Sequence, residues 1–307
     1  MTEVPTEEDS SRQDRVPDLI AAALVAAPDS DERAVYIRAL HFHRAHDEVF
    51  AGARELVLSP DPDQREVGVD ILGSVGLERT SEDRINLARR SSDLTDSIIE
   101  LLLKVMRSET VPRVLEALGF AFGHLDDPRP VDALVAQRRH PDENVRYAVV
   151  YGLLMHDVDS AVSALIELSR DPDSHVRDWA TFGLGSQIER DTPAVRAALA
   201  ARLSDEDEDT REEAICGLAA RGDDRAVRPM LELLNEGCEG PALNEALYRL
   251  AAQVRHPDLC RHAGMHWRRA HAPGATFDPL RNTDHEYLLD AARNCGFSGA
   301  ELKTHSG

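Results

Sequence analysis

Histidines gather in two stretches of the chain, and histidine is a common ligand of zinc and iron. In the first stretch, HFHRAHDE at 41–48, only His43 and His46 are spaced to share one face of a helix. The stretch straddles a predicted turn, and polar turn residues explain it better than a metal site does. The candidate ligands there are His41, His43, His46 and Asp47.

The second stretch is HPDLCRHAGMHWRRAH at 256–271. His262 and His266 lie four residues apart, so one helical face would present both, and His256 or Cys260 would add a ligand. The spacing matches no familiar zinc motif, and a terminal amphipathic helix explains these residues equally well. We therefore assign no metal ion and no cofactor from the sequence.

Other catalytic patterns do not stand out. No nucleophile motif, glycine-rich phosphate loop or pair of catalytic carboxylates is recognisable, so no catalytic residue is assigned. The acidic run SDEDEDTREE at 204–213 lacks the turn glycine and the ligand spacing of a calcium loop. A solvated loop with Asp207 as a helix cap explains the run better, and it also offers a docking point for a basic partner.

Aromatic residues form the most suggestive surface pattern. Tyr147 and Tyr151 share a helical face, and Trp179 and Phe182 roughly do so as well. Tyr248 occupies the position that corresponds to Tyr151 and Phe182 in a later repeat. We interpret these five residues as a candidate partner-binding surface, although aromatics at helical spacing more often pack against neighbouring helices.

A repeated helix must position these residues. Around Arg177, an aspartate lies four residues before and a leucine seven residues after, with apolar or small residues at offsets three and four. Offsets of 3, 4 and 7 share one helical face, so each copy predicts an amphipathic helix. The leucine recurs at spacings of 32, 46, 35, 31, 34 and 32 residues, which predicts a helical solenoid. Its copies are Leu40, Leu72, Leu118, Leu153, Leu184, Leu218 and Leu250.

Two polar columns accompany the leucines. The aspartate, usually preceded by proline, is expected to cap the helix by accepting backbone N–H groups. The arginine recurs in the first helical turn, where a cation opposes the helix dipole. We therefore expect each arginine to pair with a loop carboxylate of its own or the neighbouring repeat. The arginines are Arg33, Arg65, Arg146, Arg177 and Arg211.

The repeats resemble the HEAT repeat, in the short bacterial form also seen in phycobilin-lyase-like proteins. The resemblance covers roughly residues 29–255 and implies an all-α, right-handed α-α superhelical solenoid of about seven helical hairpins. The segments that carry it are DPDQREVGVDILG (61–73), HPDENVRYAVVYGL (140–153), DPDSHVRDWATFGLG (171–185) and DEDEDTREEAICGL (205–218).

The resemblance is nearly silent about activity. Deoxyhypusine hydroxylase uses this repeat with several His-Glu pairs, whereas here only His285 and Glu286 form such a pair. No chromophore-handling residue of a phycobilin lyase can be picked out. DNA glycosylases with a similar solenoid need an electropositive groove, which the composition argues against.

The organisation predicted around the repeats has four parts. Residues 1–15 form an acidic disordered tail and residues 16–28 a cap helix. The repeats occupy residues 29–255, with an inserted helix and loop near 81–97 that accounts for the long spacing. Residues 256–307 form a C-terminal cap and tail.

The composition indicates which class of partner the protein binds and in which cellular compartment it is located. Lysine and arginine number 35 and aspartate and glutamate 56, so the formal charge is −21. This charge disfavours nucleic acid and favours a basic protein partner. Cysteines at four scattered positions indicate reduced thiols of a bacterial cytoplasm, and the apolar run at 19–27 is too short to span a membrane.

We therefore predict a non-catalytic protein-binding scaffold or adaptor that acts along a groove lined by the second helix of each hairpin. The alternative is a metal-dependent or lyase-like enzyme that uses the histidines near either end.

Overall fold

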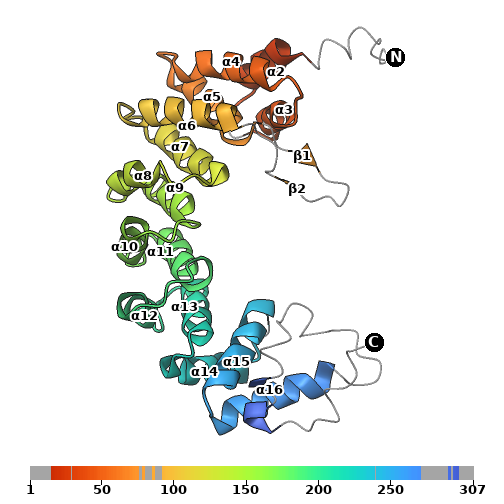
Figure 1. Cartoon of the computed structure of the whole chain (residues 1–307), viewed down its shortest axis with the longest axis vertical. Coiled ribbons are helices and arrows are strands. Elements are labelled where there is room, and N and C mark those ends of the chain that lie inside the picture. The colour runs from red at the N-terminus through yellow and green to blue at the C-terminus, as the bar shows by residue number, and fades with distance from the viewer. Residues whose placement is uncertain are drawn as a thin grey trace. The chain divides into compact units, whose positions relative to one another are not determined.

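The protein is described here from a computed structural model, and its described residues are almost entirely helical (Figure 1). They fall into two compact units, 1–156 and 157–307. The described residues are 15–28, 30–75, 78–79, 85–86, 92–238, 240–270, 290–291 and 293–296.

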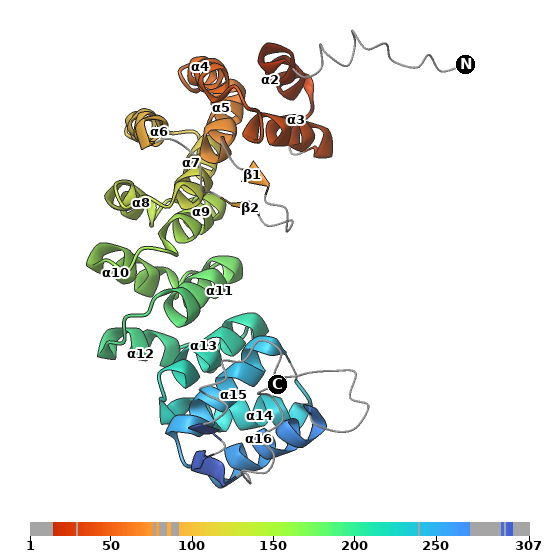
Figure 2. The same cartoon turned by 45° about the vertical axis from the view of Figure 1, so that its right-hand side comes forward.

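In the first unit, helices that carry the repeated leucine pack against one another in chain order: α3 on α5, α5 on α7 and α7 on α9. Alternate helices pack behind them, α4 on α5, α6 on α7 and α8 on α9, so that the helices form two rows (Figure 2). The helices are α2 (Val16–Val25), α3 (Asp31–His41), α4 (His46–Val57), α5 (Pro62–Ser74), α6 (Ser92–Met106), α7 (Pro112–Leu125), α8 (Val131–Gln137) and α9 (Glu143–Leu153).

The second unit repeats this arrangement. Helix α11 packs on α13 and α13 on α15, while α10 and α12 pack behind α11 and α13. The elements are α10 (Asp159–Leu168), α11 (Ser174–Phe182), the π-helical turn η1 (Gly183–Gln187), α12 (Pro193–Ala200), α13 (Glu208–Ala220), the short η2 (Asp224–Ala226), α14 (Val227–Glu236), α15 (Pro241–Gln253) and α16 (Pro257–Ala270). In each unit by itself we call the helices that carry the repeated leucine the leucine row: α3, α5, α7 and α9 in the first unit, and α11 with η1, α13 and α15 in the second.

The seven leucines form the apolar interior of these helices. Every one of them, from Leu40 to Leu250, has 0% of its surface exposed. Small residues let the leucine-row helices approach their neighbours closely: a methyl group added at Gly68 would lie 2.9 Å from the carbonyl oxygen of Ala53. The predicted buried stripe is therefore confirmed, and burial of each leucine stabilises the fold by roughly 1.5–3 kcal/mol.

The predicted aspartate caps are confirmed in four repeats. Asp61, Asp142, Asp173 and Asp207 each accept a backbone N–H of the helix that follows. In the first repeat Ser30 takes this role and accepts from the backbone N–H of Arg33. The acidic residues at the same position in the first and last repeats, Asp29 and Glu239, lie outside the described residues. Such a cap stabilises a helix by about 1 kcal/mol.

The arginine column is anchored mainly by its own loop. Arg146 and Arg211 donate to carbonyl oxygens five and six residues earlier in the chain. The expected carboxylate partner is present for Arg177, whose Nη2 lies 3.0 Å from Asp205 of the next repeat, and for Arg65, whose Nε lies 2.7 Å from Glu109. The guanidinium therefore ties each helix start to the preceding loop and, in these two repeats, to the following hairpin.

The long interval after Leu72 is occupied differently from the prediction. Within 81–97, residues Ile85–Asn86 pair as an antiparallel strand with Glu78–Arg79, and residues 92–97 already belong to α6. The remaining residues of 80–91 lie outside the described part. The described residues of 81–97 therefore contain no separate inserted helix. Residues 92–97 instead form the N-terminal part of α6, the same helix that contains IIELLLKVM at 98–106.

A disulfide in the C-terminal part contradicts the prediction that all four cysteines are reduced thiols. Cys260 on α16 forms a disulfide with Cys295, with Cα atoms 5.1 Å apart, while Cys216 and Cys238 are free. Asn294 supports the pairing, since its Nδ2 donates to the carbonyl oxygen of Ala251 at 2.7 Å. Scattered spacing did not reveal the pair, because it depends on residues 293–296 folding back onto the end of α15. The predicted 1–15 tail and residues 271–289 lie outside the described residues, apart from residue 15.

Candidate functional site

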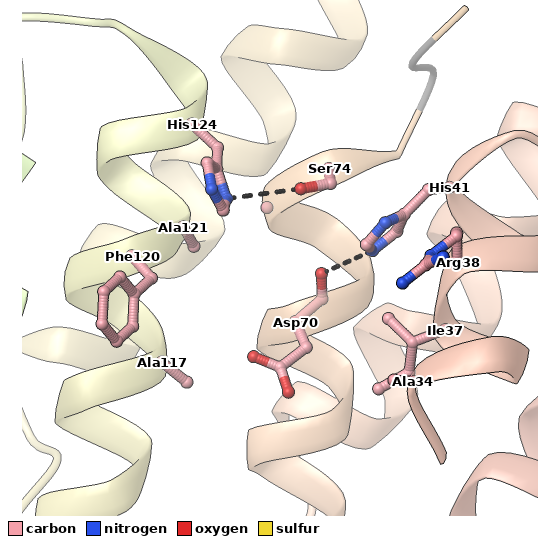
Figure 3. A pocket seen from close by; sticks show the side chains of 11 residues that line it. Ala34, Ile37, Arg38, His41, Asp70, Ser74, Ala117, Phe120, Ala121 and His124 are labelled. Carbon is pink, nitrogen blue, oxygen red and sulfur yellow. Dashed lines mark hydrogen bonds between the residues drawn. The ribbon is translucent and has the colours of Figure 1, made fainter. Parts of the chain in front are cut away.

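A cavity of about 320 Å³ lies in the first unit between α3, α5 and α7. Its wall carries apolar side chains from α3 and α7 and polar ones from all three helices (Figure 3). His41 donates from Nε2 to the carbonyl oxygen of Asp70 at 3.0 Å, and Ser74 Oγ hydrogen-bonds Nδ1 of His124 at 3.3 Å. These two bonds hold both imidazoles in place around the opening.

An aromatic cluster adjoins this cavity. The ring of Phe120, which lines the cavity, meets Tyr147 edge-on at a centroid distance of 5.8 Å and Tyr151 at 5.2 Å. His124 lies edge-on to Tyr151 at 5.5 Å. The predicted residues Tyr147 and Tyr151 are both half-buried on α9, where such ring pairs add about 0.5–1.5 kcal/mol beyond area burial.

In the second unit, Trp179 and Phe182 form a ring pair of their own on α11. Their centroids are 5.8 Å apart at an interplanar angle of 70°, and both side chains are half-buried. Each ring thus keeps part of its surface accessible to a partner.

Tyr248 does not belong to an exposed surface. It is 0% exposed, and its hydroxyl donates to the carbonyl oxygen of Ala263 at 3.1 Å. Burial raises its pKa. The sequence pattern placed it in one column with Tyr151 and Phe182, but α16 packs over α15 and covers this position. The inclusion of Tyr248 among partner-contacting residues is therefore corrected.

Four carboxylates gather on α11 and α13, and we call Asp178, Asp209, Glu212 and Glu213 the acidic face. Burial raises the pKa of Glu213 to about 7, with the charges of Asp178 and Glu212 adding to the effect. Burial likewise raises the pKa of Asp178 to about 6, helped by the charges of Asp207 and Asp209, and Oδ1 of Asp178 is buried without a hydrogen bond among the described residues. Glu212 is shifted in the same direction, with the pKa raised by burial first.

Cations pair with none of these four carboxylates among the described residues. The contrast with nearby loops is clear, because Asp205 pairs with Arg177 and Asp223 pairs with Arg196 and Arg225. The pKa of Asp223 is correspondingly lowered by its arginine partners. The loop charges are thus neutralised internally, whereas the acidic face retains negative charge that a basic ligand would neutralise.

A smaller hollow of about 230 Å³ lies beside the acidic face, on η1, α13 and α15. Cys216 lines it, and burial strongly raises the pKa of this thiol, which keeps it protonated and a poor nucleophile. Glu245 also lines it but pairs with Arg249 at 2.6 Å. Both this hollow and the larger cavity lie on the leucine row, not on the second helices that the sequence favoured.

The histidine stretches take structural positions where they are described. His41 bonds the backbone as given above, and His43 accepts from the backbone N–H of Ala45 at 3.1 Å. His262 is 7% exposed, and desolvation lowers its pKa. Within the described residues no group of three or more His, Cys, Asp or Glu side chains is arranged to hold a metal, and the side chain of His266 lies outside them.

Sequence reasoning missed the cavity and most of the acidic face. The cavity residues Asp70 and His124 come from different repeats and carried no motif. Glu212 and Glu213 belong to the acidic run 204–213, which the sequence predicts to be a solvated loop, but they lie on α13. The sequence feature that could have revealed Glu212 and Glu213 was their position on the same helical face as Cys216, and not the run of charge itself.

Among the described residues, no helix is long and apolar enough to cross a membrane.

Comparisons with known proteins agree with this architecture. The family of HEAT repeats matches residues 99–185 and 162–251. The bilin biosynthesis protein PecE of Nostoc sp. is 30% identical over 181 residues, which span 56% of this chain and 71% of that protein. The crystal structure of Escherichia coli YibA superposes with a TM-score of 0.66 at 20% identity, covering 97% of this chain and 99% of that one. An engineered protein superposes with a TM-score of 0.53 at 18% identity, covering 92% and 79%.

Proposed function

The chain belongs to the HEAT-repeat family with short, phycobilin-lyase-like repeats, and on that premise we propose that it is a non-catalytic scaffold or adaptor that binds a basic protein. The acidic face carries this proposal. Its carboxylates are partly buried, close to one another and form no ion pair with any residue that the structure describes, an arrangement that costs folding free energy. A Lys- or Arg-rich segment of a partner would supply the missing counter-charges.

The neighbouring rings suit the same partner. Trp179 is the residue after Asp178 on α11, and it pairs edge-on with Phe182. An Arg guanidinium that reaches the carboxylates would also stack on an indole face, which adds roughly 0.5–2 kcal/mol. In the first unit, Tyr147 and Tyr151 remain candidates for a second contact area.

A binding experiment with matched variants tests this function. A fluorescein-labelled peptide of alternating Lys, Arg and small apolar residues is titrated with the full chain at pH 7.5, and its anisotropy is recorded. The Asp178→Asn/Glu213→Gln double variant removes two charges from the acidic face. The Glu232→Gln/Glu236→Gln variant removes two exposed charges from α14 and leaves the same net charge.

We expect the acidic-face variant to weaken binding at least about tenfold and the α14 variant less than about twofold, because partly buried charges are screened less. Binding of the unmodified protein should also weaken as salt is raised. Equal losses for the two variants would show that the peptide senses only the net charge of −21. That outcome would remove the acidic face from the proposal.

A lyase-like enzyme is the second candidate, favoured by the similarity to PecE, which is described as a bilin biosynthesis protein. A metal-dependent enzyme would require stoichiometric zinc or iron in untagged protein, lost in a His262→Ala/His266→Ala variant. Elemental analysis of that pair of proteins separates the metal-dependent enzyme from the scaffold.

A cytoplasmic location is part of the same proposal, and the disulfide weighs against it. Disulfides persist mainly in oxidising compartments. Alkylation of thiols in intact cells, followed by mass spectrometry, reports whether Cys260 and Cys295 are joined there. Free thiols at both positions would support the reducing cytoplasm.

A further inference from the structure

The cavity between α3, α5 and α7 has a composition that differs from the rest of the protein. Three of its side chains, Arg38, His41 and His124, are cationic or become so on protonation, and only Asp70 is acidic. Counted in the same way, with the 13 histidines added to the 35 lysines and arginines, the whole chain has 48 basic residues against 56 acidic ones. A concave site with more basic than acidic side chains favours an anionic ligand.

The apolar part of the cavity wall provides a surface against which the apolar part of a ligand can pack. Ile37, Ala117 and Ala121 are buried wall residues, and Phe120 contributes the edge of a ring system that continues into Tyr151. Small side chains at the two alanines leave the space open. The volume of about 320 Å³ is within the range of small-molecule sites and suits a ligand of one or two fused rings.

Arg38 is the group best placed to fix the charged end of a ligand. It lies at the exposed edge of the cavity, and no hydrogen bond or ion pair joins its guanidinium to any residue that the structure describes. Its fork of N–H donors therefore remains open to a carboxylate, which it can bind through two parallel bonds. The imidazole of His41, held by the Asp70 carbonyl, lies on the same helix one turn further on (Figure 3).

We propose that this cavity binds a small aromatic monoanion, with its carboxylate at Arg38 and its ring against the Phe120 wall. The proposal is independent of the acidic face, because the cavity lies wholly within the first unit and the acidic face wholly within the second.

Three probes of nearly equal size test the charge requirement: indole-3-acetate, indole-3-acetamide and tryptamine. Each is titrated into the full chain and followed by ligand-detected NMR and calorimetry. The anion should bind at least about tenfold more tightly than the amide, because a carboxylate accepts two parallel bonds from Arg38 as an ion pair, whereas the neutral amide offers one oxygen and no charge. Tryptamine should bind most weakly.

Two pairs of variants test the location. Arg38→Gln should lower the affinity for indole-3-acetate about tenfold and leave that for the amide unchanged, whereas Arg44→Gln, an exposed residue outside the cavity, should change neither. Ala34→Trp should fill the cavity and abolish binding of both. Ala39→Trp, exposed on the same helix but outside the cavity, should not.

The proposal is overturned by any of three results. These are equal or tighter binding of tryptamine, an Arg38→Gln variant that binds the acetate normally, and no saturable binding of any probe at millimolar concentration. Because the peptide titration uses the other unit, its failure leaves these measurements unaffected, and the reverse is also true.

Discussion

Replacing Glu213 with glutamine should stabilise the protein at neutral and alkaline pH. Glutamine has nearly the same volume and removes only the charge of a carboxylate that burial and two acidic neighbours disfavour. The Ser186 hydroxyl, which hydrogen-bonds this carboxylate, can donate equally well to an amide oxygen. The change therefore isolates the electrostatic cost of the acidic face.

The size of the effect follows from the shifted pKa. A rise from 4.5 to about 7 corresponds to an upper limit of about 3.4 kcal/mol between the charged and neutral forms. Glu213 is half-buried, so solvent screening reduces this figure, and we expect a gain of about 1–2 kcal/mol at pH 8. Glu236→Gln on α14, where the side chain is exposed, should change the free energy of unfolding by less than about 0.5 kcal/mol.

The pH dependence has a definite sign. Because the folded-state pKa of Glu213 is raised, protonation of this group favours the folded state. That contribution is complete below the unfolded value of 4.5 and is lost as the pH rises through about 7. The advantage of the glutamine variant should therefore be near zero at pH 4.5 and should grow until about pH 8.

Urea unfolding measured at several pH values provides the assay. The fluorescence of Trp179 on α11 reports on the second unit, and the other tryptophan, Trp267, is replaced by phenylalanine in every protein compared. Only differences between variants are used, so other titrating groups cancel. A gain that is constant from pH 4.5 to pH 8, or a loss of stability at pH 8, would refute the burial and crowding argument for the acidic face.

Four further outcomes are expected. Binding of the basic peptide at pH 6.5 should release protons, seen by calorimetry in buffers of different ionisation enthalpy, because a cation favours the charged form of Glu213. Asp205→Ala should cost about 2–3 kcal/mol in urea unfolding, since it leaves buried Arg177 with only the exposed carboxylate of Glu206 at 3.5 Å, whereas Asp159→Ala at the exposed Arg190 pair should cost under about 0.5 kcal/mol. Tyr248→Phe should cost about 1 kcal/mol by the same measurement, through loss of the bond to the Ala263 carbonyl. Thiol titration of denatured protein without reductant should yield two thiols, and with reductant four.

The sequence by itself determined the repeating helix. The leucine column, the capping aspartates and the small residue at Gly68 are local consequences of helical periodicity and of backbone N–H groups that need acceptors. Their burial and hydrogen bonds could therefore be predicted at single residues, as Leu184 and Asp173 show. The arginine column was predicted to need a carboxylate, and Arg177 and Arg65 have one.

Only the tertiary structure decided which positions of that helix are exposed at the protein surface. Tyr151 and Tyr248 occupy the same place in the repeat, yet one is half-buried beside a cavity and the other lies beneath α16. The cavity, the disulfide and the raised pKa of Glu213 likewise depend on groups from separate repeats or from the C-terminal segment. A repeat pattern specifies the contacts that every unit makes with its neighbour, whereas function here rests on the side chains that differ from one unit to the next.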